Sequence, residues 1–196
     1  MTTREKLIDS AIELLSNKSY NSVGVQQLCE RAEVKKGSFY HFFPSKRDLT
    51  IVALDTIWEN FKTHMLLPIL ETDLEPLDKL KTIMEQGYKH LVSSKSSNGC
   101  VSGCNIGNLA VELSTQDEEI RKKIVSIFDE WTGFIEILIQ DAISRGQLSS
   151  KINVRATAQA LLAFVEGTLL LCKTYNDPEI MKNISNNAFN ILRVIK

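Results

Sequence analysis

VQQLCERAEVKKGSFYHFFPSKR, which spans residues 25–47, decides the fold of the N-terminal part of the chain. Apolar residues recur at helical spacing in its first third and predict a helix with one buried face. They are Val25, Leu28, Cys29 and Ala32. Glu33-Val34 fits a tight turn, and polar and basic residues follow on a second short helix. Two short helices joined by a tight turn are typical of a helix-turn-helix motif.

Four aromatic residues follow within the second short helix and after it. We expect Phe39, Phe42 and Phe43 to pack into the core of a small three-helix domain. Tyr40 differs from them, because its hydroxyl can reach a DNA phosphate while its ring packs. Pro44-Ser45 ends the helix, and Ser45 with Asp48 predicts a capping box for the next one.

The motif predicts which side chains meet DNA. A helix fits the major groove, where base edges present distinct donors and acceptors. We expect Lys36, Ser38 and His41 to face bases, with Lys35 at the helix start and Gly37 allowing close approach. Phosphate contacts position a protein rather than specify sequence. The residues expected at phosphates are Gln26, Gln27, Tyr40 and Lys46.

The same stretch resembles the TetR family of bacterial transcriptional regulators. The pattern A-x-V-x-K-G-x-F-Y-x-x-F-x-S-K carries the resemblance, together with Tyr20, Val25 and Leu28. Three positions depart from the family pattern: Ser19 and Glu33 stand where glycine is usual, and Lys35 stands where a Ser or Thr cap is usual. The resemblance implies a DNA-binding regulator, in most cases a repressor. It would bind a palindromic double-stranded operator as a homodimer and be released by a small-molecule effector.

Composition sets the broad class. The chain has 196 residues, of which 43% are hydrophobic and 24% charged, and its net charge is −1. Residues 1–50 hold 8 Lys or Arg against 6 Asp or Glu, so the small excess of positive charge lies at the N-terminal end. No signal segment is expected, and the longest apolar run, Ala158–Cys172, is shorter than the roughly 20 residues of a membrane span. We therefore expect a cytoplasmic protein that does not cross a membrane.

Helical periodicity predicts an all-α fold of about nine helices and no strand. We expect a helix-turn-helix domain over residues 1–47 and an effector-binding and dimerisation domain over residues 48–196. The expected helices cover about residues 3–17, 46–67 (ending before Pro68), 77–92, 103–113 and 115–145. The two short helices of the motif lie between the first two of these, one further helix begins at Asn153, and the last follows the cap at Asp177. Ser93–Ser102 is expected to be a mobile loop, and Thr115 with Glu118 to cap the helix that Gly146 ends.

The last two expected helices predict a dimer interface. One carries small residues at steps of three and four, which lets another helix approach closely: Ala156, Ala160, Ala163 and Gly167. The other carries an apolar stripe of Ile180, Ile184, Ala188, Ile191 and Ile195. Two adjacent apolar helices suit a symmetric four-helix dimer, and the family resemblance implies the same arrangement.

A second informative stretch is GCVSGCNIGNLAVE, residues 99–112. Its part G-C-x-x-G-N-L-A-x-E resembles the NemR-like branch of the family, which includes electrophile- and oxidant-responsive repressors. The resemblance makes Cys104 a candidate sensing thiol, and Cys100 could resolve it as a disulfide. A thiol at a helix N-terminus has a stabilised thiolate. Alternatively Cys104 simply lines a pocket. Cys29 and Cys172 lie on apolar faces and are expected to be inert.

The family pattern places an effector among the middle helices, in a mostly apolar pocket with a few polar anchors. Glu166 is one further polar group there. The expected lining residues are Phe61, His64, Met65, Tyr88, Cys104, Asn108, Trp131, Phe134 and Phe164.

Two other interpretations compete with the regulator. One is a thiol-dependent redox enzyme built on Cys100 and Cys104; against it stand the C-x-x-x-C spacing and the lack of a βαβ pattern or a matched base. The other is a helical ligand-binding module whose DNA domain has decayed, against which Lys36-Gly37 and Lys46 argue. The cysteine spacing fits no zinc site, so neither a metal nor a cofactor is expected. The sequence does not specify the operator, the regulated genes or the effector.

Overall fold

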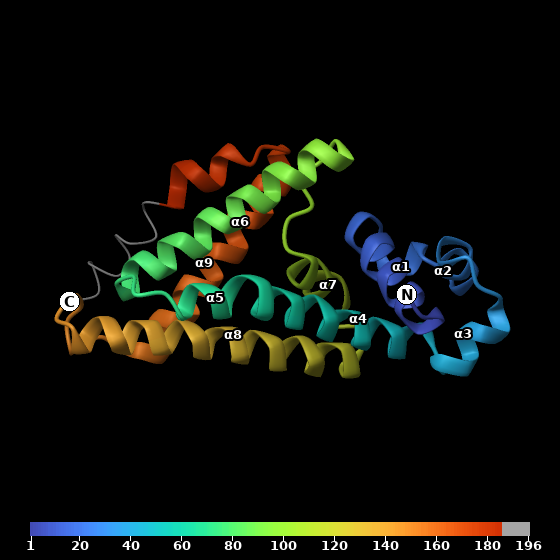
Figure 1. Cartoon of the computed structure of the whole chain (residues 1–196), viewed down its shortest axis with the longest axis horizontal. Coiled ribbons are helices and arrows are strands. Elements are labelled where there is room, and N and C mark those ends of the chain that lie inside the picture. Colours follow the sequence, from blue (N-terminus) through green and yellow to red (C-terminus); the bar gives the residue numbers. More distant parts are fainter. Residues whose placement is uncertain (186–196) are drawn as a thin grey trace. The chain divides into compact units, whose positions relative to one another are not determined.

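The structure is a computed structural model, and it describes residues 1–185. Within these residues the chain is helical and contains no strand, as expected (Figure 1). The N-terminal helices are α1 (Thr3–Asn17), α2 (Val25–Ala32), α3 (Lys36–Phe42) and α4 (Lys46–Phe61). The helices that follow in the described part are α5 (Leu67–Leu70), α6 (Pro76–Asn98), α7 (Asn105–Leu113), α8 (Glu118–Ser144) and α9 (Val154–Tyr175). Residues 179–185 are also helical.

The chain forms two compact units. Unit 1 comprises Met1–Phe61 and Asn105–Ser126, and unit 2 comprises Lys62–Cys104 and the residues from Ile127 onward. Unit 1 therefore contains the helix-turn-helix and also α7 with the first part of α8. The expected domain boundary at residue 47 stays a prediction about how the chain divides its functions.

The core of unit 1 forms from α1 to α4. The Thr2-x-x-Glu5 pattern forms a capping box at the start of α1, because the Thr2 hydroxyl accepts from the Glu5 N–H and the Glu5 carboxylate accepts from the Thr2 N–H. Buried apolar residues then come from each helix and close a single small core. They are Leu7, Ile8, Ala11, Leu15, Val23, Leu28, Cys29, Ala32, Phe39, Phe43, Leu49 and Ala53.

Phe42 does not belong to this core, so that prediction was wrong. Its side chain is 38% exposed, whereas Phe43 is 2% exposed and Phe39 fully buried. A helix places residues four apart on one face, so Phe39 and Phe43 share the buried side. Phe42 lies off that face and packs edge-to-face on His41, with ring centroids 4.8 Å apart.

Two helices extend beyond their predicted ends. The helical backbone does not stop before Pro68, because Lys62–Leu66 form a π-helical turn and Leu67–Leu70 a further α-helical turn. Proline is tolerated in a first helical turn, where its missing N–H has no intrahelical partner. α6 continues to Asn98 and ends at Gly99, whose φ of 73° is left-handed. The segment 93–98 is therefore helix rather than a mobile loop.

The serines at positions 93–97 predict a loop but lie within α6. The Ser96 hydroxyl donates to the Val92 carbonyl at 2.9 Å, one turn earlier, so the side chain is satisfied inside the helix. The cap of α8 also differs from the prediction. Asp117, not Thr115, accepts the N–H groups of Glu119 at 3.1 Å and Ile120 at 3.2 Å. Asn153 caps α9, since its side chain accepts from the Ala156 N–H.

Candidate nucleic-acid interface and effector region

The turn between α2 and α3 sets how the second helix is presented. Glu33 ends α2 in a left-handed conformation with φ of 56°. Lys35 occupies the N-cap position of α3 with an extended backbone and makes no side-chain cap. Glu33 thus adopts the conformation that a glycine adopts more readily, and the missing cap follows from Lys35, which has no acceptor oxygen. Phe39 anchors α3 to the core, and Tyr40 meets its ring edge-to-face at a centroid distance of 5.2 Å.

The outer face of α3 carries most of the predicted base contacts. Lys36, Gly37 and His41 are exposed, Tyr40 is 55% exposed, and Ser38 is half-buried. A Cβ added at Gly37 would meet no heavy atom within 4 Å, so this position leaves open space above the helix. The face therefore presents one cation, one imidazole and one phenol around a gap without a side chain.

The predicted phosphate contacts lie in different settings. Gln26 is exposed and donates to Glu30 at 2.8 Å, while Gln27 is half-buried and Lys35 is exposed. A further cation that sequence reasoning missed is Arg4, whose guanidinium lies 5.6 Å from the centroid of the Phe43 ring. Local sequence carries no signal for this contact, because it joins the start of α1 to the end of α3.

Lys46 is held inside unit 1. Its ammonium donates to the carbonyls of Tyr20 at 2.8 Å and Val23 at 2.9 Å. It also lies 3.8 Å from the centroid of the Tyr20 ring. Burial lowers the pKa of Lys46. Both carbonyls belong to the connection between α1 and α2, so Lys46 fixes that connection, and its contact with a phosphate stays a prediction.

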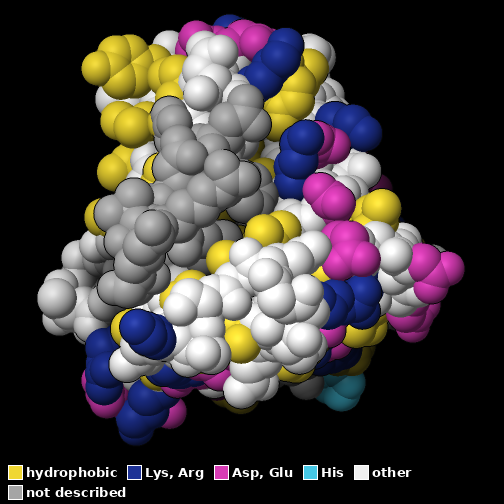
Figure 2. Space-filling view, turned by 90° about the vertical axis from the view of Figure 1, so that its left-hand side faces the viewer, with side chains coloured by type: hydrophobic (Ala, Val, Ile, Leu, Met, Phe, Trp, Pro, Cys, Tyr) yellow, Lys and Arg dark blue, Asp and Glu magenta, His cyan; other side chains and the backbone are white. Residues whose placement is uncertain are grey.

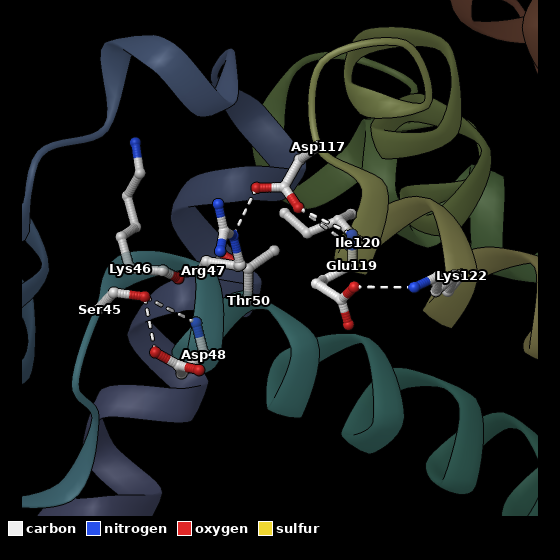
Figure 3. Close-up of polar contacts among 9 residues, drawn as sticks. All are labelled: Ser45, Lys46, Arg47, Asp48, Thr50, Asp117, Glu119, Ile120 and Lys122. Atoms are coloured by element: carbon white, nitrogen blue, oxygen red, sulfur yellow. Dashed lines mark hydrogen bonds and ion pairs between the residues drawn. The ribbon is translucent and has the colours of Figure 1, made fainter.

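The residues around Lys46 join α4 to the start of α8 (Figure 3). The Ser45 hydroxyl donates to the Asp48 carboxylate at 2.6 Å and accepts from the Asp48 N–H at 3.3 Å, which confirms the cap at the start of α4. The Arg47 guanidinium donates to Asp117 at 2.6 Å. Burial alone would raise the pKa of Asp117. Arg47 and the backbone N–H groups that donate to this carboxylate outweigh burial, so the pKa lies below its ordinary value.

The expected effector residues divide between the two units. Phe61 and Asn108 belong to unit 1, and the others belong to unit 2. Phe61 stacks on Trp58 with centroids 5.6 Å apart. Trp131 is buried, Met65, Phe134 and Phe164 are half-buried, and His64 is exposed on the π-helical turn. A single pocket lined by all nine residues stays a prediction.

Tyr88 has a partner of its own. Its hydroxyl donates to the carboxylate of Glu179, and Lys182 lies 6.0 Å from the centroid of its ring. This hydrogen bond raises the pKa of Tyr88. The contact joins α6 to the helical residues that follow α9. Figure 2 shows one face of the molecule, on which Lys or Arg and Asp or Glu side chains are interspersed with hydrophobic side chains.

Cys104 lies beside a buried carboxyl group. Cys104 is half-buried and directly precedes α7, as the helix N-terminus prediction required. Its thiol is hydrogen-bonded to Glu166 of α9, and burial raises the pKa of that carboxyl while the thiol lowers it. The Glu166 Oε1 atom is buried and has no hydrogen-bond partner among the described residues. When Glu166 is ionised, its charge disfavours a thiolate at Cys104 and opposes the effect of the helix N-terminus.

The remaining cysteines fit their predicted settings. Cys29 and Cys172 are buried, and burial raises the pKa of each thiol. Cys100 is exposed, and its carbonyl accepts from the Ser94 hydroxyl at 3.2 Å. A disulfide between Cys100 and Cys104 stays a prediction. Within residues 1–185, no group of three or more His, Cys, Asp or Glu side chains is placed to hold a metal ion.

Comparison with known proteins matches both parts of the chain to family models. Residues 7–52 match the model described as bacterial regulatory proteins, tetR family. Residues 76–187 match the model described as tetracyclin repressor-like, C-terminal domain. The two matches together include α2, α3 and α6 to α9 in full and α1 and α4 in part, while α5 lies between them.

Individual proteins match over nearly the whole chain. An HTH-type transcriptional regulator in the lacX 3′ region of Lactococcus lactis is 28% identical over 191 residues, 97% of this chain and 91% of that protein. The HTH-type transcriptional repressor NemR of Escherichia coli K12 is 24% identical over 97% of this chain and 94% of NemR. A crystal structure of regulatory protein TetR from Rhodobacter sphaeroides gives a TM-score of 0.82 at 26% identity, covering 94% of this chain and 95% of that one.

Proposed function

Because the chain belongs to the TetR family of bacterial transcriptional regulators, we propose that it is a repressor that binds a palindromic operator as a homodimer and is released by an effector. It is a DNA-binding regulator of the helix-turn-helix type and not an enzyme. The relative NemR is named a transcriptional repressor, which supports repression over activation.

The exposed face of α3 carries this proposal. Lys36 can donate to guanine O6 and N7, and His41 can serve a base or a phosphate. The open space at Gly37 lets the helix backbone approach the groove. Tyr40 keeps its ring against Phe39 while more than half of its surface stays exposed, so its hydroxyl is free to reach the backbone of the duplex. We assign α3 to the major groove on these grounds.

The exposed face of α9 supports a homodimer. The small residues Ala156, Ala160, Ala163 and Gly167 are all exposed in the single chain, and Leu170 is 58% exposed beside them. Exposed apolar surface on a helix with small residues favours close packing of a second helix. The residues Ala188, Ile191 and Ile195 of the predicted second interface helix lie outside the described residues, and Ile180 and Ile184 are half-buried.

The length and composition of α9 also meet the minimum for a membrane span, with a mean hydropathy of 1.3 over 18 residues. The apolar run Ala158–Cys172, which is shorter than a membrane span, forms only part of this helix. A third of that window is buried within the chain, and the rest includes the proposed dimer face. Burial in a four-helix dimer would cover this apolar surface in water. We propose a cytoplasmic location for this reason.

A two-fold dimer would place two copies of α3 about 34 Å apart, which is one turn of DNA, and would read a near-palindrome. The chain passes from unit 1 to unit 2 after Phe61, at the end of α4. We propose that an effector bound in the C-terminal part displaces α4 and changes this spacing. Such a change requires different effector affinities in the two states.

The effector is proposed to be a small apolar molecule or an electrophile that adds to Cys104. Half-buried and buried aromatic residues of unit 2, such as Trp131 and Phe134, favour an apolar ligand. Reaction with an electrophile requires loss of the Cys104 thiol proton, and the carboxyl group that is hydrogen-bonded to this thiol belongs to Glu166, whose pKa is raised by burial.

The deciding experiment measures binding to DNA. The chain would be titrated onto labelled DNA from directly upstream of its own coding region, with excess unrelated duplex as competitor, before and after addition of a thiol-reactive quinone. Tight binding that the competitor fails to displace is expected. Release by quinone in the wild type but not in Cys104→Ser supports the sensing thiol. Release in neither leaves a reversible ligand as the effector, and failure to bind any DNA in preference to competitor contradicts the operator.

A further inference from the structure

Glu112, the last residue of the G-N-L-A-x-E segment, accepts hydrogen bonds from the connection between α1 and α2. It lies in the last turn of α7, inside unit 1. Its Oε1 atom accepts from the Ser19 hydroxyl at 2.5 Å, and its Oε2 atom accepts from the Tyr20 N–H at 3.0 Å. The Asn21 N–H approaches Oε1 at 3.4 Å. One carboxylate therefore collects three donors from three consecutive residues.

These donors keep Glu112 ionised. Burial alone would raise its pKa, but the hydrogen bonds from Ser19, Tyr20 and Asn21 and the positive charge of Lys46 together lower the pKa below its ordinary value. Hydrogen bonds to an ionised group are roughly twice as strong as those between neutral groups. Glu112 therefore acts as an anion that binds the backbone of the connection between α1 and α2.

Lys46 binds the same connection at its carbonyl groups. Tyr20 offers its N–H to Glu112 and its carbonyl to Lys46, while Val23 offers a second carbonyl to Lys46. The connection thus lies between an anion from α7 and a cation from α4. A separate ion pair between Arg47 and Asp117 joins the start of α4 to the residue that precedes α8 (Figure 3).

The connection leads directly into the DNA-reading helices. Val23 is fully buried, and Gly24 is the N-cap of α2, so the start of α2 is fixed by the position of residues 20–23. The α2 residues Leu28, Cys29 and Ala32 then share one core with Phe39 of α3. A shift of the connection would move the start of α2, and α3 would be presented at a different angle.

We propose that Glu112 is a positioning residue for operator binding, which holds the α1–α2 connection through Tyr20 and Lys46 so that α3 meets the groove in one orientation. This inference rests on the proposed function, because it assumes that α3 reads an operator. Glu112 itself touches no DNA in it. α7 begins directly after Cys104 in the sequence, so Glu112 follows the candidate sensing thiol by eight positions along the chain.

The test compares Glu112→Gln with the matched control Glu119→Gln in the full-length chain. Both changes remove one negative charge from unit 1, but Glu119 is an exposed residue of α8 whose carboxylate pairs with Lys122 at 3.0 Å. Hydrogen–deuterium exchange would report on the N–H groups of Tyr20 and Asn21. Fluorescence anisotropy would report affinity for the upstream operator fragment and for unrelated duplex, at a temperature at which thermal unfolding shows both variants folded.

We expect Glu112→Gln to raise exchange at Tyr20 and Asn21 and to weaken operator binding by about tenfold, with binding to unrelated duplex changed by less than about twofold. Glu119→Gln should change neither. Ser19→Ala removes one donor and leaves the carboxylate, so it should give a smaller loss of the same kind. It also keeps the test open if Glu112→Gln fails to fold.

A purely structural role would lower the melting temperature but leave operator affinity of the folded variant unchanged. Equal operator affinity of the wild type and Glu112→Gln would therefore overturn the inference, as would unchanged exchange at Tyr20 and Asn21. If the wild type itself bound no DNA in preference to competitor, the proposed function would fail and this inference with it. The two failures differ in whether the wild type binds specifically.

Discussion

Arg47 and Asp117 join the first turn of α4 to the residue that caps α8, with the Arg47 Nε atom 2.6 Å from the Asp117 carboxylate. The same carboxylate accepts the N–H groups of Glu119 and Ile120 through its other oxygen. Asp117 therefore has two separate tasks, and Arg47 shares only one of them. The pair allows the helix cap to be separated from the ion pair by mutation.

Asp117→Ala removes both the cap and the ion pair, so we expect it to destabilise the chain by about 1–2 kcal/mol. Arg47→Ala removes only an ion pair with an exposed guanidinium, so it is expected to cost less stability than Asp117→Ala. Urea unfolding of both variants measures the difference. A larger loss in Arg47→Ala than in Asp117→Ala would contradict the assignment of Asp117 as the cap.

The pH dependence of the Asp117 contribution has a definite sign. The folded-state pKa of Asp117 lies below its ordinary value of 3.8. Its stabilisation is therefore present above 3.8 and is lost as the pH falls through the lower folded-state pKa. Glu112, whose pKa is also lowered, has the same sign with an ordinary value of 4.5. The stability gap between wild type and Asp117→Ala should narrow in acid, and a gap that stayed constant would contradict it.

Glu33 occupies a left-handed conformation with φ of 56°, at the end of α2. A side chain costs about 1–2 kcal/mol in this conformation, while glycine adopts it freely at some cost in unfolded-state entropy. We expect Glu33→Gly to stabilise the chain by about 0.5–1 kcal/mol and to raise the melting temperature by roughly 1–4 °C.

Glu30→Gly provides the matched control, because Glu30 lies inside α2 and accepts a hydrogen bond from Gln26. Glycine inside a helix costs roughly 0.5–1 kcal/mol, so this variant should be less stable than wild type. Calorimetry of both variants decides the matter. Destabilisation by Glu33→Gly would show that its side chain contributes more than the backbone conformation costs.

The N-terminal motif could be predicted because its signals are local. The helical periodicity of residues 25–32, the cap at Thr2 and the turn at Glu33 each depend on residues only a few positions apart. The same holds for Asn153 at the start of α9 and for Gly146, which lies just after the end of α8 and has a left-handed φ of 74°. Local backbone preferences are enough to fix such features.

The contacts of Glu112 and Lys46 with the α1–α2 connection could not be predicted, because they depend on residues far apart in sequence. Glu112 and Tyr20 are separated by 92 positions. Nothing in the sequence around Lys46 shows that its ammonium binds the carbonyls of Tyr20 and Val23 rather than solvent. The length of α6 was missed for a different reason: serines are common in loops, and only the structure shows that Ser96 bonds back to Val92.

Lys36 is exposed at the start of α3 and is predicted to meet DNA. Lys36→Ala should weaken operator binding, and the slope of log affinity against log salt should fall by about one unit if Lys36 neutralises a phosphate. If Lys36 contacts a base instead, discrimination against mismatched sites should fall while the slope holds. Lys122→Ala, an exposed lysine of α8 paired with Glu119, is the control and should change neither quantity. Binding identical to wild type would remove Lys36 from the interface.

Glu166 is the buried carboxyl beside Cys104, with a raised pKa and one oxygen that lacks a partner. An unfolded chain ionises this group near its ordinary value of 4.5, whereas the folded chain holds the proton to higher pH. Below 4.5 both states are protonated and the group has no effect, and above it the folded state loses stability relative to the unfolded state. Glu166→Gln removes this penalty, so it should stabilise the chain at pH 7 and have little effect at pH 4.

Glu85→Gln, on the exposed face of α6, should have little effect at either pH. Thermal unfolding of both variants at the two pH values tests this. A loss of stability in Glu166→Gln at pH 7 would mean that the carboxylate is ionised and satisfied in the folded chain, and Cys104 would then face a permanent negative charge that opposes its reaction with electrophiles.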